Sequence, residues 1–71
     1  MVMERQAVES SAIESIGYEA ESQTLEVEFK GRRVYRYFGV PASEYQALMT
    51  ADSIGAYMNE SIKPLYRFEE A

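Results

Sequence analysis

The stretch that decides the fold runs from residue 24 to residue 38 and reads TLEVEFKGRRVYRYF. In TLEVEF, the apolar residues Leu25, Val27 and Phe29 alternate with acidic residues, a pattern typical of a strand with one buried and one polar face. The following KG pair allows a tight reversal, and the remaining residues form the most β-prone run in the chain. The stretch therefore predicts an antiparallel hairpin at the centre of the protein.

The length of the hairpin loop decides which face the two tyrosines of the second strand occupy, because a one-residue slip exchanges the faces. A two-residue loop would place Tyr35 and Tyr37 on the solvent face. A three-residue loop would place both on the buried face and set Arg36 opposite Glu26. We favour the three-residue loop, because the other register buries Arg36 among aliphatic side chains without a partner. The two-residue register stays open as the alternative.

Weaker patterns predict further strands on both sides of the hairpin. Residues 11–18 predict a strand anchored by Ile13 and Ile16, whose spacing of three predicts a bulge near Ser15 or Gly17. Near the other end, the aromatic residues Tyr66 and Phe68 alternate with Leu65 and Arg67 and predict a last short strand. The pair Glu69-Glu70 then reads as an ordinary acidic tail.

Two short helices are predicted between the hairpin and the last strand. The first spans about residues 42–50 after Pro41, and the second begins at a cap formed by Asp52 or Ser53. Gly55 in the second helix costs about 1 kcal/mol relative to alanine, and close packing of a neighbouring element would explain its presence. The expected fold is α+β, with an antiparallel sheet of three to four strands packed against two short helices. Residues 1–9 are expected to form a flexible or partly helical arm, and residues 10–71 a single domain.

The composition argues against most kinds of chemistry. The 71 residues include no cysteine and no histidine, which excludes disulfides, thiolate catalysis and the usual zinc sites. No serine lies in a nucleophile-elbow motif, and no glycine-rich loop opens a helix to hold a phosphate. Glu26 and Glu28 share a strand face and could act as an acid–base pair, but the simpler interpretation is a solvated face with Glu26 paired to Arg36. We expect no catalytic activity, no bound metal and no cofactor.

Charge is distributed unevenly along the chain. The net charge is −5, from seven basic and twelve acidic residues, yet four of the basic residues lie within residues 30–36, which contain no acid. Guanidinium groups recognise phosphates, and tyrosine rings stack on bases. We therefore expect the candidate ligand site to comprise five residues of this strand, and its ligand to be RNA or a nucleotide-like molecule. These residues are Arg32, Arg33, Tyr35, Arg36 and Tyr37. The alternative is that the tyrosines are core and the arginines balance acids on the neighbouring strand.

Short length without crosslinks favours a second class of function, a protein-interaction or self-assembly module. A third hypothesis combines both classes, as a small oligomeric protein of phage or bacterial origin that sequesters signalling nucleotides. No export signal is evident, because Glu4 and Arg5 follow Met1-Val2-Met3 at once. No apolar run approaches membrane-spanning length. We expect a cytoplasmic protein with no membrane partner.

An ordered set of short motifs extends through most of the chain. It comprises SSAI at residues 10–13, Tyr18, LEVEF at 25–29, VYRYF at 34–38, VP at 40–41, SIGAYMN at 53–59 and Ile62. Over residues 10–69 the chain resembles the KTSC domain, a module named for its place at the C-terminus of some lysyl-tRNA synthetases. The family also occurs as small stand-alone bacterial or phage proteins. Its central mark is a Tyr-x-Tyr sequence, here Tyr35-Arg36-Tyr37, whereas Lys30-Gly31 departs from the more usual Asn-Gly turn. The resemblance implies no particular enzymatic activity and, through the link to a tRNA enzyme, implies a role in RNA binding.

Overall fold

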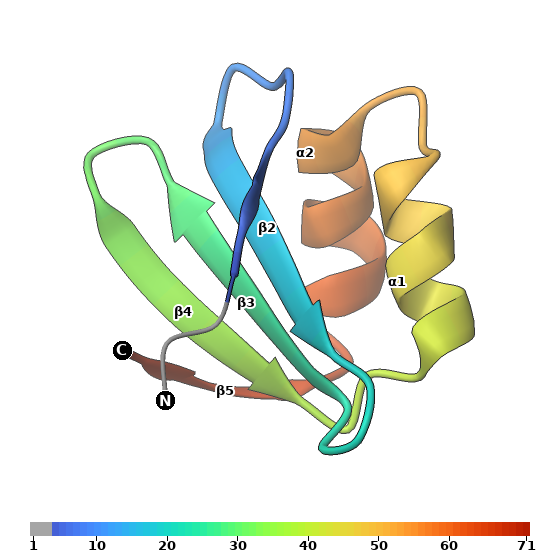
Figure 1. Ribbon diagram of the computed structural model, residues 1–71. Helices are drawn as coiled ribbons and strands as arrows, with labels where there is room; N and C mark the ends of the chain where they lie inside the picture. Colours follow the sequence, from blue (N-terminus) through green and yellow to red (C-terminus); the bar gives the residue numbers. More distant parts are fainter. Residues whose placement is uncertain (1–3) are drawn as a thin grey trace.

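Residues 4–71 are described by a computed structural model, in which a five-stranded antiparallel sheet carries helices on one face (Figure 1). The strands follow one another across the sheet in chain order, from β1 to β5. No helix among the described residues is both long and apolar enough to cross a membrane. The elements are β1 (Gln6–Ala7), β2 (Ile13–Glu19), β3 (Thr24–Phe29), β4 (Arg33–Phe38), α1 (Ala42–Met49), α2 (Ile54–Tyr57), the π-helix η1 (Met58–Ile62) and β5 (Arg67–Glu70).

The central hairpin has the three-residue loop that the sequence favours. Leu25 of β3 pairs with Tyr37 of β4, and Glu26 pairs with Arg36. Directly paired residues share a face of the sheet, so both tyrosines of β4 lie on the face of Leu25 and Val27. This face carries the helices, as predicted, and Arg36 lies on the opposite face.

A bulge in β2 explains the irregular spacing of its two isoleucines. Ile13 pairs with Phe29 whereas Ser15 pairs with Glu28, so Glu14 is an extra residue in the ladder. The extra residue restores Ile13 and Ile16 to the same buried face, and neither is exposed to solvent. The predicted bulge near Ser15 is therefore confirmed.

The core fills the space between the sheet and the helices. Leu48 comes from α1, while Met58 and Ile62 come from η1, which continues α2 without a break. The Ser53 side chain caps α2 by accepting a hydrogen bond from the backbone N–H of Ala56 at 3.2 Å. The buried hydrophobic residues among those described are Ile13, Ile16, Leu25, Val27, Tyr37, Val40, Leu48, Met58 and Ile62.

Two tyrosine hydroxyl groups connect α1 to α2 and to the segment that precedes β5. The Tyr66 hydroxyl donates a hydrogen bond to the Glu44 carboxylate at 3.0 Å, and the Tyr57 hydroxyl donates to the other oxygen of that carboxylate. Tyr66 immediately precedes β5, so the contact fixes the point at which the chain leaves the helices and enters the sheet. The position of β5 beside β4 is thus coupled to the helix packing.

Three expectations require correction. The sheet has five strands rather than three to four, because β1 pairs with β2 within the segment expected to be a flexible or helical arm. Residues 1–3 of that arm lie outside the described residues. Glu69 and Glu70 are not a tail, since they belong to β5 and pair with Arg36 and Tyr35 of β4. The strand predicted over residues 65–68 is present as β5 but begins two residues later, whereas β1 is not predicted at all. Each of these edge strands is short, and neither has a buried residue to give it a clear period.

Candidate ligand-binding pocket

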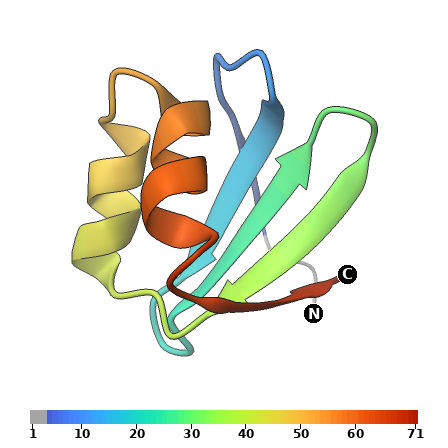
Figure 2. The same cartoon turned by 180° about the vertical axis from the view of Figure 1, so that it is seen from behind.

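A pocket of about 390 Å³ opens on the helix-bearing face of the sheet, beside its β5 edge. Figure 2 shows the helices packed toward one side, with the ribbons of β4 and β5 extending beyond them. Four aromatic and two cationic side chains line the pocket, and we call this set the aromatic pocket. Its members are Phe29, Arg33, Tyr35, Tyr37, Lys63 and Phe68.

The four rings of the aromatic pocket contact one another in sequence. Phe29 and Tyr35 meet edge to face, with centroids 5.7 Å apart and planes at 81°. Phe68 is tilted against both Tyr35 and Tyr37, with centroids 5.7 Å from each. Tyr37 is only 3% exposed and Phe68 is 56% exposed. The rings therefore run from a buried floor to an open rim, where a planar ligand has access to ring faces.

Both cations lie near the Phe29–Tyr35 end of this aromatic surface, since Arg33 pairs directly with Phe29 across the hairpin. The Arg33 guanidinium carbon is 5.9 Å from the Tyr35 ring centre, and the Lys63 ammonium nitrogen is 5.0 Å from the Phe29 ring centre. Lys63 directly follows η1. Its backbone N–H donates a hydrogen bond to the carbonyl of Met58 at 2.8 Å, which is the five-residue spacing of a π-helix. The wider helical turn thus ends at the residue that lines the pocket.

Arg33 has a carboxylate partner on the neighbouring strand. Its guanidinium donates two hydrogen bonds to Glu70, each 3.3 Å long. These bonds raise the pKa of Arg33, which keeps the side chain charged. Both side chains are well exposed, at 64% for Arg33 and 47% for Glu70. The pair is therefore a weak surface interaction that a stronger anion could replace.

Tyr37 contributes a neutral phenol to the floor of the pocket. Burial, and to a smaller extent the neighbouring Tyr35, raises the pKa of Tyr37 above its ordinary value of 10.0. The phenol therefore stays protonated across the physiological range and can donate one hydrogen bond to a bound ligand.

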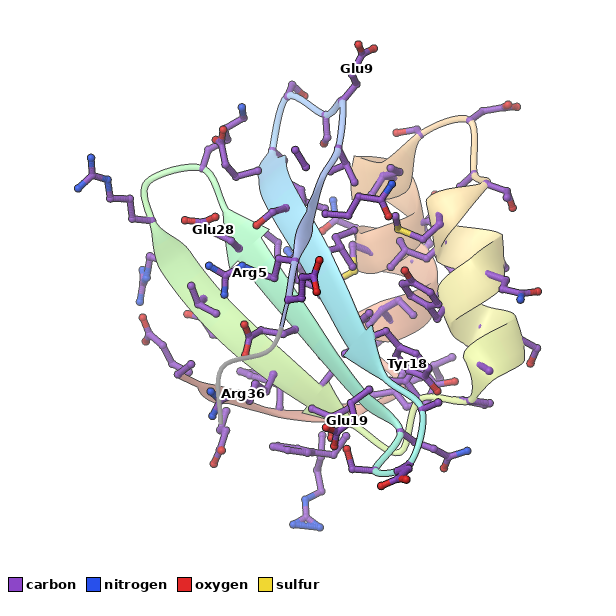
Figure 3. All side chains as sticks on the ribbon, in the orientation of Figure 1. Arg5, Glu9, Tyr18, Glu19, Glu28 and Arg36 are labelled. Atoms are coloured by element: carbon purple, nitrogen blue, oxygen red, sulfur yellow. The ribbon has the colours of Figure 1, made fainter. Side chains whose placement is uncertain are left out.

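Arg36 lies on the opposite face of the sheet, where it serves a different purpose. Its Nε donates to Glu26 at 2.9 Å, while Arg5 donates to the second oxygen of the same carboxylate. Figure 3 shows Arg5, Glu28 and Arg36 on this face of the sheet, away from the helices. Arg5 also donates to Ser15 at 3.0 Å, and Ser15 donates to Glu28 at 2.9 Å.

This network corrects the interpretation of the polar face of β3 as solvated. Glu26 is only 3% exposed, although its predicted pairing with Arg36 is confirmed. Burial would raise the pKa of Glu26, but hydrogen bonds from Arg36 and Arg5 outweigh it, and the pKa is lowered. The carboxylate is thus held in its charged form by two guanidinium groups.

The structure therefore divides the five residues expected at the ligand site. Arg33, Tyr35 and Tyr37 lie together in the aromatic pocket, whereas Arg36 is on the opposite face. Arg32 lies in the hairpin loop, and no carboxylate among the described residues forms an ion pair with it.

Sequence reasoning missed three members of the aromatic pocket, Phe29, Lys63 and Phe68. The alternating pattern predicts that Phe29 lies on the buried face of its strand, but Phe29 is at the end of β3 and is only partly buried. Phe68 could have been found from its position opposite Tyr37, had the pairing of the last strand been known. Lys63 gave no local signal, because only the tertiary fold brings it to Phe29. No group of three potential metal ligands is present among residues 4–71.

Comparisons with known proteins place the chain in a family. Residues 9–66 match the KTSC domain. The chain belongs to the KTSC domain family. A crystal structure of a KTSC domain protein from Yersinia pestis superposes with a TM-score of 0.94 at 37% identity and covers 99% of each chain. The resemblance inferred from the ordered set of short motifs is therefore confirmed.

Relatives of this KTSC domain occur in two settings. A protein from Stutzerimonas stutzeri is 48% identical over 67 residues, which cover 93% of this chain and 94% of that protein. A lysine–tRNA ligase from Nostoc punctiforme is 42% identical over 62 residues, covering 87% of this chain but only 11% of the ligase. The KTSC domain is thus found both as most of a small protein and as a minor part of a large enzyme.

Proposed function

We propose that this KTSC domain is a small non-catalytic binding module whose ligand is a nucleotide or a short segment of single-stranded RNA. The observation that carries the proposal is the aromatic pocket, where Arg33 and Lys63 lie beside an open aromatic surface. A base stacked on such a surface gains about 1–3 kcal/mol, and guanidinium groups bind phosphate through paired hydrogen bonds. The pocket volume of about 390 Å³ suits a ligand of this size.

The surrounding charges support a local site rather than an extended one. The net charge of −5 repels a long phosphate backbone. A single nucleotide, or a few nucleotides of RNA, needs only the two cations of the pocket. Some relatives are lysine–tRNA ligases, enzymes named for an RNA substrate, which is consistent with an RNA ligand. The absence of histidine and cysteine from the sequence supports a binding role over a catalytic one.

Binding of labelled single-stranded oligonucleotides and of free nucleoside phosphates tests the proposal. We expect saturable binding that weakens with salt, because phosphate contacts release counterions. Arg33→Ala/Lys63→Ala should weaken binding at least about tenfold, since each charged hydrogen bond contributes about 1.5–3 kcal/mol. Comparison of the two ligand types shows whether one nucleotide is sufficient.

Arg32→Ala is the matched control for the single variant Arg33→Ala, because each removes one positive charge and Arg32 lies in the adjacent loop outside the aromatic pocket. An equal loss of affinity in Arg32→Ala would show that binding depends on overall charge rather than on the pocket. The absence of binding by any ligand in the panel would overturn the proposal.

A protein-interaction module is the second candidate, and the edge of the sheet favours it. Among the described residues, β5 pairs only with β4, so one side of its backbone has no strand partner. Leu65 and Phe68, at 69% and 56% exposed, lie just before and within this strand. An oligomer that sequesters nucleotides would combine this candidate with the first.

A further inference from the structure

The unpaired side of β5 presents a definite set of backbone groups. The N–H of Ala71 donates to the carbonyl of Val34 in β4 at 2.8 Å. Backbone groups point to alternate sides along a strand, so those of Arg67 and Glu69 also point toward β4. The N–H and C=O groups of Phe68 therefore point outward, away from the sheet. In Figures 1 and 2 no described strand lies beyond β5 on this side.

Exposed apolar side chains gather at the same edge. Among the described residues, the large hydrophobic side chains that are exposed are Phe38, Leu65 and Phe68. Phe38 pairs with Arg67 of β5, and Leu65 lies two residues before that strand. An unpaired strand edge with exposed apolar residues is a template for addition of another strand.

We infer that a second copy of this chain pairs with β5 in an antiparallel register centred on Phe68, which joins the two sheets across a two-fold axis. This inference gives a partner to the protein-interaction candidate and does not depend on the nucleotide proposal. In such a dimer, the helix-bearing faces of the two sheets lie on the same side of the joined sheet. One residue of β5 lies directly opposite its own copy at the axis. The identity of that central residue fixes every other pair.

Charge selects the central residue. With Phe68 at the axis, Arg67 lies opposite the partner's Glu69, and Glu69 lies opposite the partner's Arg67. Arg67 and Glu69 share the face that carries Arg36, so these are true cross-strand pairs. With Arg67, Glu69 or Glu70 at the axis instead, two like charges would oppose each other. Only the register centred on Phe68 is self-complementary along this strand.

The backbone supports the same register. The outward N–H and C=O of Phe68 can exchange two hydrogen bonds with the partner's Phe68, as directly opposed residues do in an antiparallel pair. Arg67 and Glu69 cannot occupy the hydrogen-bonded centre, because their backbone groups point toward β4. Hydrogen bonding allows Phe68 or Glu70 at this centre, and the repulsion between two opposed Glu70 carboxylates then selects Phe68.

The dimer would bring the partner's Phe68 to the rim of the aromatic pocket. Phe68 lines this pocket and lies on the same face as Tyr37. Opposed residues of neighbouring strands have their side chains in contact, so the two Phe68 rings would adjoin and the two pockets would meet at the axis. A four-residue strand buries little surface, so we expect a reversible dimer rather than an obligate one.

Substitutions that reverse the charges of Arg67 and Glu69 test the register, with the dimerisation constant measured by sedimentation equilibrium. Arg67→Glu places two pairs of like charges across the axis and should weaken dimerisation about tenfold or more. Glu69→Arg should weaken dimerisation to the same extent, because it places two pairs of positive charges across the axis. The double variant Arg67→Glu/Glu69→Arg restores both pairs and should dimerise like the unmodified chain.

A mixture of the two single variants provides the most specific test of the register. Each variant repels itself, but Glu at position 67 then meets Arg at position 69 across the axis, so the mixture should form a heterodimer. Circular dichroism confirms that each variant is folded; if Glu69→Arg is not, Glu69→Gln in the Arg67→Glu background should recover part of the association. A monomeric unmodified chain at the highest attainable concentration, or a dimer insensitive to these changes, would overturn the inference.

Discussion

Arg36 on β4 donates a hydrogen bond from Nε to Oε2 of Glu26 on β3 at 2.9 Å, directly across the central strand pair. The Glu26 side chain is only 4% exposed, and its second oxygen accepts a hydrogen bond from Arg5. A buried carboxylate is stabilised in the fold only when its charge and lone pairs are satisfied. The basic character of β4 is therefore in part a requirement of its acidic neighbour.

Glu26→Gln should lower the free energy of unfolding by about 2 kcal/mol, because two charge-assisted hydrogen bonds become weaker and two guanidinium groups lose their counter-charge. For a domain of this size, the midpoint of thermal unfolding should fall by about 10 °C. Glu14→Gln is the matched control, since Glu14 pairs with Lys30 at the surface and its side chain is 54% exposed. Equal losses in the two variants would contradict the structural role of Glu26.

Stability should decrease at acid pH through the same carboxylate. The pKa of Glu26 in the folded protein lies below its ordinary value of 4.5. The unfolded chain therefore takes up a proton first as the pH falls, so the contribution of Glu26 is complete above pH 4.5 and is lost as the pH falls through the folded pKa. Urea unfolding across this range should show a smaller pH dependence in Glu26→Gln. An identical dependence in both proteins would show that other groups are responsible.

The sequence predicts the structural features that depend on residue alternation and turn chemistry. It does not predict contacts between segments that are far apart in the chain. The three-residue loop followed from the penalty for burying Arg36, and the bulge in β2 followed from the spacing of Ile13 and Ile16. The pairing of β5 with β4 could not be read from RFEE, which has no buried residue. For that reason the pocket contribution of Phe68 was also beyond reach, whereas Lys63 was missed because only the tertiary fold brings it to Phe29.

The hairpin loop contains a conformation that arginine adopts at a penalty. Arg32 has φ of 67° and follows Gly31, which has φ of 92°. Left-handed conformations cost most L-residues about 1–2 kcal/mol, and asparagine tolerates them better. Arg32→Asn should therefore raise the free energy of unfolding by about 0.5–1 kcal/mol, as measured by chemical denaturation.

Gly31→Ala gives the opposite expectation at the preceding position. Nothing lies within 4 Å of an added methyl group there, so only the backbone conformation opposes the change. We expect a loss of about 1 kcal/mol. A stabilising Gly31→Ala, or a destabilising Arg32→Asn, would show that the loop does not hold the positive φ values seen here.

Gly55 in α2 should tolerate alanine with a gain in stability. An added methyl group would lie 3.6 Å from Ser10 Oγ and 3.8 Å from Ala12 Cβ, which are ordinary packing distances. The segment before β2 thus packs over Gly55 without excluding a methyl group. Gly55→Ala should gain up to about 1 kcal/mol through helix propensity. Ala56→Gly in the same helix is the reverse control and should lose a similar amount, so a loss in both variants would indicate a steric requirement for glycine.

Glu70 should restrict access of an anionic ligand to Arg33. Its carboxylate accepts both hydrogen bonds from that guanidinium, and the pair is exposed enough to contribute little to folding. Glu70→Gln should therefore leave thermal stability nearly unchanged while it raises the affinity for a nucleoside phosphate several-fold, as measured by calorimetric titration. Glu14→Gln removes the same charge from a comparable ion pair outside the aromatic pocket and should raise the affinity less. Equal gains in the two variants would assign the effect to net charge, and a lower affinity in Glu70→Gln would mean that Glu70 itself holds Arg33 in its binding position.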